Sequence, residues 1–132
     1  MFAVNRYETG KILTRRASGI VRKYDAGCPH RVGDELVLTS KFLPAGSPNG
    51  RGVPFAKAQI VTIRPSTVRQ FKEDPMIAEM DGYNNSSVWY EQMRVMYKGL
   101  RDTDQVYHLK LRFIEIDGDA GHAKSEERQD DF

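Results

Sequence analysis

Cysteine is almost absent from this sequence, in which Cys28 is the only one. A single thiol excludes an intramolecular disulfide and a cysteine-rich metal cluster, and no catalytic-cysteine signature surrounds it. The histidines His30, His108 and His122 have no spacing that suits a zinc site, so each is interpreted as a surface or strand residue. We therefore expect no metal and no other cofactor.

Long apolar runs are lacking too. No stretch of about 18 apolar residues occurs, and the first residues are too polar for a signal peptide, so we expect a cytoplasmic protein without a membrane partner. The 132 residues, 39% of them hydrophobic, suffice for one core, which we expect to lie within a single domain over residues 1–116. The charged composition of residues 117–132 predicts a flexible tail, because it buries too little surface to offset its ordering entropy.

Charge is unevenly distributed along the chain. Residues 1–72 contain 13 Lys or Arg and 4 acids, whereas residues 73–132 contain 7 Lys or Arg and 14 acids. A basic half indicates a polyanionic partner such as RNA. The alternative is that these cations are solvated and face the acids of the second half. The candidate RNA contacts in the first 31 residues are Arg6, Arg15, Arg16, Arg22 and Lys23.

Strands are predicted in both halves. Residues 11–16 can form an extended segment, and residues 35–39 a strand that follows the turn pair Gly33-Asp34. Alternation predicts a strand over residues 55–63 that ends near Pro65, and a stronger one over residues 105–116. Two prolines and three glycines between positions 42 and 53 indicate a loop.

Three short helices are indicated by their end signals. Thr67 to Gln70 fits a capping box, and Asp74 with Pro75 fits an N-cap followed by proline at the first helical position. Gly82 can end this second helix in a left-handed conformation, which places Asp81 at its C-terminus. A third helix is expected after residues 84–87. Its apolar stripe is interpreted as core rather than as a base-stacking surface, and consists of Trp89, Met93, Met96 and Tyr97.

The segment from Gly10 to Arg16 carries the candidate chemistry. If it is extended, Thr14 and Arg16 share one face of the strand while Lys11 lies at its entrance. A lysine whose pKa is lowered by burial or by a nearby cation could take the proton of a threonine nucleophile. Without catalysis, the same side chains could bind a phosphate or a base edge.

These residues resemble the signature of the ASCH family, in which a glycine is followed by Lys-x-x-Thr-x-Arg and later by a Gly-Asp pair that opens a strand. The chain has Lys11-x-x-Thr14-x-Arg16 and Gly33-Asp34, and residues 56–61 and 78–83 are also similar to the family. The resemblance covers residues 4–116. It implies an α+β PUA-like β-barrel with two or three short helices and an association with RNA. Because the chain starts so close to Val4, little room is left for the first strand and helix that the family usually has.

One bacterial branch of the family is an amidohydrolase that removes the acetyl group from acetylcytidine with a Thr, a Lys and a Glu. The resemblance assigns these roles to Thr14, Lys11 and Asp81, although the branch has Glu where this chain has Asp. Glu79 is the alternative acid if the turn is shifted. We therefore expect a domain that binds RNA or a modified nucleoside in a cleft lined by Lys11, Thr14 and Arg16. The alternatives are an amidohydrolase acting on acylated cytidine, or a small ribonuclease.

Overall fold

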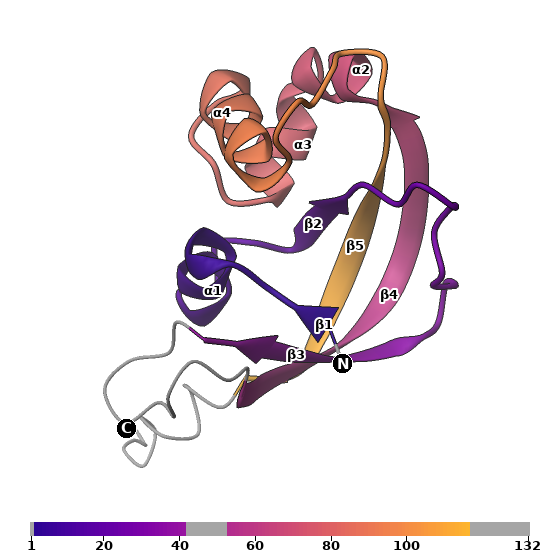
Figure 1. Cartoon of the computed structure of the whole chain (residues 1–132). Helices are drawn as coiled ribbons and strands as arrows, with labels where there is room; N and C mark the ends of the chain where they lie inside the picture. Colours follow the sequence, from indigo (N-terminus) through magenta and orange to yellow (C-terminus); the bar gives the residue numbers. More distant parts are fainter. Residues whose placement is uncertain (1, 42–52, 117–132) are drawn as a thin grey trace.

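The computed structural model describes residues 2–41 and 53–116, and the loop and tail predicted at 42–52 and 117–132 lie outside them. The described part contains five strands and four short helices (Figure 1). In chain order the elements are β1 (Phe2–Ala3), α1 (Arg6–Leu13), β2 (Gly19–Arg22), β3 (Glu35–Ser40), β4 (Val53–Thr67), α2 (Val68–Lys72), α3 (Pro75–Met80), α4 (Ser86–Met96) and β5 (Gln105–Ile116).

The five strands form one sheet in the order β1-β3-β4-β5-β2. β1 runs parallel to β3, and the other neighbours are antiparallel. β4 and β5, with 15 and 12 residues, are the long curved strands around which the sheet curls into a half-barrel (Figure 1). The predicted α+β barrel class is therefore confirmed, with four helices in the described part instead of two or three.

The two faces of the sheet belong to two apolar cores. On β5, Leu109 and Leu111 join the core that α1 covers, whereas Val106 points to the opposite face and joins the core beneath α2, α3 and α4. β2 behaves in the same way, with Ile20 in the first core and Val21 in the second. This follows from the alternation of side chains along a strand.

A β-bulge changes the phase of β4. Ala58 and Ile60 face the first core, and the register then shifts between Ile60 and Thr62, so that Ile63 rather than Thr62 packs against that core. The strand also continues through Pro65 to Thr67 instead of ending near Pro65. Beyond Ile60 the described pairing of β4 is with β5 alone, and at such an edge the missing N–H of a proline is tolerated.

The three predicted helices are confirmed, the first two at the predicted caps, while the third begins at Ser86, within the segment after which it was expected, with Asn85 as its N-cap. Thr67 and Gln70 exchange the hydrogen bonds of a capping box, and Asp74 accepts from the N–H of Met76. Gly82 follows α3 with a φ of 84°. The apolar stripe of α4 is core, since its central residues Trp89 and Met93 are buried. Within the described residues no helix is long and apolar enough to cross a bilayer.

The prediction of an extended segment over residues 11–16 is wrong, because residues 6–13 form α1. Asn5 and Glu8 make a capping box at its start, and Ile12 buries its apolar face. The helix ends with Arg15 in the left-handed region at a φ of 59°, where the N–H of Arg16 donates to the carbonyl of Lys11 at 2.7 Å. A first strand and helix, for which little room was expected, are both present and are short, with 2 and 8 residues.

Candidate functional site

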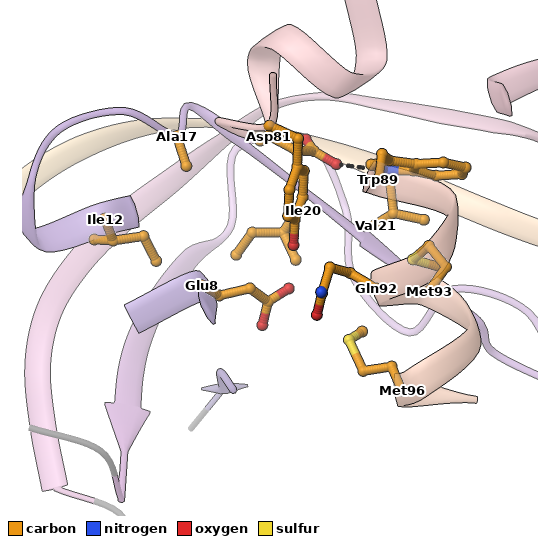
Figure 2. A pocket seen from close by; sticks show the side chains of 12 residues that line it. Glu8, Ile12, Ala17, Ile20, Val21, Asp81, Trp89, Gln92, Met93 and Met96 are labelled. Atoms are coloured by element: carbon orange, nitrogen blue, oxygen red, sulfur yellow. Dashed lines mark hydrogen bonds between the residues drawn. The ribbon is translucent and has the colours of Figure 1, made fainter. Parts of the chain in front are cut away.

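A small cavity lies where α1, β2 and α4 meet, and we call it the inner cavity (Figure 2). Its volume of about 10 Å³ is room for about one water molecule. Polar groups are contributed by α1, by the turn after α3 and by α4, in an otherwise apolar lining. Its lining includes Glu8, Gly19, Asp81, Tyr83, Gln92 and Met96.

Asp81 is the most enclosed acid of the site. It is 6% exposed, and its Oδ1 lies 2.8 Å from Nε2 of His108 while its Oδ2 accepts from the indole N–H of Trp89 at 3.1 Å. Burial raises the pKa of Asp81, and the hydrogen bond and charge of His108 act in the opposite direction. Both carboxylate oxygens are therefore held by α4 and β5, which fixes the carboxylate at the wall of the inner cavity.

Gly19 leaves the space that this arrangement needs. A Cβ atom at this position would lie 2.4 Å from Nε2 of His108 and 2.9 Å from Oδ1 of Asp81. β2 places Gly19 opposite Lys110 in the ladder with β5, and the backbone of Gly19 forms part of the wall of the inner cavity. A glycine in a strand commonly marks such a close approach.

Lys11 and Arg16 meet at the turn that follows Asp81. A Cβ atom on Gly82 would lie 3.0 Å from the carbonyl oxygen of Arg16 and 3.1 Å from Cδ of Lys11, so the turn packs directly on this end of α1. The ammonium of Lys11 lies 4.4 Å from the centroid of the Tyr83 ring, a cation–π arrangement. Burial lowers the pKa of Lys11, and the charge of Arg16 lowers it further.

The predicted trio of Lys11, Thr14 and Asp81 is only partly brought together. Thr14 is exposed at the end of α1, where its hydroxyl donates to the carbonyl of Gly10 at 2.8 Å. Asp81 lines the inner cavity, whereas neither Lys11 nor Thr14 does. Glu79, the alternative acid, is exposed on α3. The structure thus places Lys11 beside the turn of Asp81 and points the Thr14 hydroxyl back along its own helix.

The candidate RNA contacts differ in how far they are exposed. Arg6, Arg15 and Arg16 are exposed on α1 and the turn that follows it. Lys23 donates to Asp25 at 3.0 Å. Arg22 is different, because its side chain is 11% exposed and donates to both carboxylate oxygens of Glu8, at 2.6 and 2.8 Å. Arg22 therefore has a structural role in this fold, as the partner of the Glu8 carboxylate.

Sequence reasoning missed three residues of the site, Glu8, Gln92 and His108. The spacing of Asn5 and Glu8 is a capping-box signal that could have predicted α1 and with it the position of Glu8. His108 lies two residues after Val106 and therefore on the same face of β5, and both side chains are buried. No local pattern distinguishes Gln92 from any other polar residue of a helix, so only the packing of α4 against α1 could identify it.

Comparison with known proteins supports the fold through structure rather than sequence. No family model matches the chain, and no curated protein matches it by sequence. A protein of Enterococcus faecalis V583 assigned to the DUF984 family superposes with a TM-score of 0.61 at 12% identity, covering 92% of this chain and 75% of that one. ASCH from Zymomonas mobilis superposes with a TM-score of 0.54 at 10% identity, covering 98% of this chain and 82% of that one.

Proposed function

Because the chain has an ASCH-like fold, we propose that it binds single-stranded RNA, or a nucleoside of it, beside the turn around Gly82. The observation that carries the proposal is the placement of Lys11, whose ammonium is held 4.4 Å from the Tyr83 ring next to the cationic Arg16. Two neighbouring cations can contact successive phosphates, and phosphate contacts supply most of the affinity for nucleic acids.

The surrounding charges support the same surface. α1 and the turn after it carry the exposed Arg6, Arg15 and Arg16, and the acid of this helix, Glu8, is neutralised by Arg22. Glu8 is the only acid of residues 6–18, so this segment carries a net positive charge. Electrostatic attraction of this kind weakens as salt rises, because counterions released from the RNA drive the binding.

The Lys11→Ala variant tests the proposal. Binding of a fluorescein-labelled, 12-nucleotide single-stranded RNA, followed by anisotropy over a range of salt concentrations, should weaken by about 1 kcal/mol, and the salt slope should fall by about one unit. The matched control is Lys98→Ala, which removes an equal charge from an exposed position after α4 and should leave both quantities unchanged. Failure of the wild-type protein to bind at low salt, or binding insensitive to salt, contradicts the proposal.

A second candidate function is hydrolysis of N-acylated cytidine, which is favoured by the lowered pKa of Lys11, since a neutral lysine can act as a general base. The geometry is less favourable. The Thr14 hydroxyl would have to turn from the Gly10 carbonyl toward Lys11, and Asp81 already accepts from Trp89 and contacts His108. We therefore rank hydrolysis of acylated cytidine below RNA binding as the function of this chain.

Incubation with a panel of acylated cytidines, followed by chromatography for free cytidine, distinguishes the two candidates. If the domain is a hydrolase, Lys11→Ala and Thr14→Ala should each abolish turnover, and the double variant should be scarcely slower than either, because the two residues act as one unit. If it only binds, no cytidine appears from any substrate, and Thr14→Ala leaves RNA affinity unchanged. Release of cytidine by wild-type protein at a rate that both variants retain would contradict the assignment of these residues.

A further inference from the structure

One face of β5 is covered by helices only over its first half. Val106 and His108 on this face are buried, at the end of the sheet where α2, α3 and α4 gather (Figure 1). Lys110, Arg112 and Ile114 follow on the same face at intervals of two residues, and all three are exposed. Among the described residues the helical layer therefore ends between His108 and Lys110. We call the surface formed by Lys110, Arg112 and Ile114 the open face of β5.

The open face adjoins the turn around Gly82. Lys110 lies opposite Gly19 in the ladder between β2 and β5. Ser18, the residue before Gly19, donates its N–H to the carbonyl of Met80 at 2.7 Å, which joins the start of β2 to the end of α3. The turn around Gly82 begins at the next residue of the chain. The turn and the open face are therefore neighbours across the start of β2.

The cations of the open face are available to a ligand. The ammonium of Lys110 has no ion-pair partner among the described residues. Arg112 donates to the side-chain oxygen of Gln59, which lies opposite it on β4, and a guanidinium has further N–H donors. Two exposed acids occur further along the sheet, Glu35 on β3 and Glu115 near the end of β5, and neither is paired with these two cations. An anion can therefore contact both Lys110 and Arg112.

The number and spacing of the cations fit a polymer better than a nucleoside. Two side chains on one face of a strand are separated by about 7 Å along it for every two residues. Lys110 and Arg112 add to Lys11 and Arg16, which lie beside the turn around Gly82. A nucleoside has no phosphate and a mononucleotide has one, whereas a strand of RNA presents a phosphate at every nucleotide. Four cations on two adjoining surfaces therefore match several nucleotides.

We propose that the ligand is an RNA strand of several nucleotides whose backbone crosses from the turn around Gly82 onto the open face of β5, where Lys110 and Arg112 contact phosphates. This inference rests on the proposed RNA binding and selects the polymer over the free nucleoside. Charge complementarity and the continuity of the two surfaces support it. The open face carries no aromatic side chain, so its contacts are independent of the base sequence.

Loss of single charges on the open face tests this path. Lys110→Thr and Arg112→Thr each remove one charge and introduce a residue that is favourable in a strand. Each variant should bind the fluorescein-labelled, 12-nucleotide RNA about five-fold more weakly in anisotropy titrations, and its salt slope should fall by about one unit. The triple variant with Lys11→Ala should lose about three units, because one strand contacts all three cations and the losses of separate contacts add.

Lys110→Arg is the matched control, since it keeps the charge at the same position and should bind the RNA as the wild-type protein does. Lys98→Ala, at the exposed position after α4, should also leave affinity and salt slope unchanged. Cytidine monophosphate, measured by displacement of the labelled RNA, should bind at least about ten-fold more weakly than the 12-nucleotide RNA, because it makes fewer phosphate contacts.

The outcomes separate this inference from the proposed function. If Lys11→Ala weakens RNA binding while Lys110→Thr and Arg112→Thr do not, the path over β5 is overturned and the proposed RNA binding stands. A loss of affinity that Lys110→Arg shares with Lys110→Thr, or equal affinity for the mononucleotide and the 12-nucleotide RNA, overturns it as well. Absence of any binding by the wild-type protein at low salt rejects both the inference and the proposed function.

Discussion

Replacing Arg22 with methionine should lower the free energy of unfolding by about 3–5 kcal/mol, because it leaves the Glu8 carboxylate buried without its partner. The two side chains are only 11% and 12% exposed, and Arg22 also donates to the carbonyl oxygens of Ala3 and Val21. Burial alone would lower the pKa of Arg22, but the hydrogen bond and charge of Glu8 raise it above its ordinary value. Urea unfolding followed by circular dichroism measures the loss.

The neighbouring lysine provides the control. Lys23 pairs with Asp25, which is 91% exposed, and Lys23→Met should change the stability by less than about 1 kcal/mol. The double variant Arg22→Met with Glu8→Leu should recover part of the loss, since no unpaired charge remains. An Arg22→Met protein with wild-type stability but weaker RNA binding would contradict the structural role and return Arg22 to the RNA contacts that the sequence predicts.

The Gly19→Ala variant should be destabilised by about 3 kcal/mol although it adds a single methyl group. The new Cβ atom would lie 2.4 Å from Nε2 of His108, so the ring must move and give up its contact with Asp81. Overpacking and the loss of a buried polar contact then add together, and Asp81 keeps only the indole N–H of Trp89. Urea unfolding measures the change, and the ring resonances of His108 report whether the contact is broken.

Gly10→Ala is the matched control for this effect. Gly10 lies inside α1, and a Cβ atom there would meet nothing within 4 Å. Alanine in a helix loses less backbone entropy on folding than glycine does, so this variant should gain about 0.5–1 kcal/mol. Equal stability of the Gly10→Ala and Gly19→Ala proteins would show that the space beside His108 is not limiting.

Part of the site follows from the sequence and part does not. The order of the motifs predicts the ASCH-like fold, and the glycine after Asp81 predicts a turn that the structure places on Lys11 and Arg16. The motif at residues 11–16 suggests an extended conformation that is wrong. These residues alone do not show that a helix capped by Asn5 and Glu8 begins before them. The Thr14 hydroxyl consequently faces the Gly10 carbonyl rather than a strand neighbour.

The sequence by itself determined the features that depend on neighbours in the chain. Caps at Thr67 and Asp74 and the alternation along β5 are local, because a side chain a few residues away satisfies the backbone or shares a strand face. The tertiary structure alone decided which charged side chains are buried and paired with one another. Arg22 is neutralised by Glu8, 14 residues away, and Asp81 meets His108, 27 residues away, since burial makes an unpaired charge too costly to leave. No pattern of charge along the chain records such pairings, because they are set by the packing of α1, β2, α3 and β5.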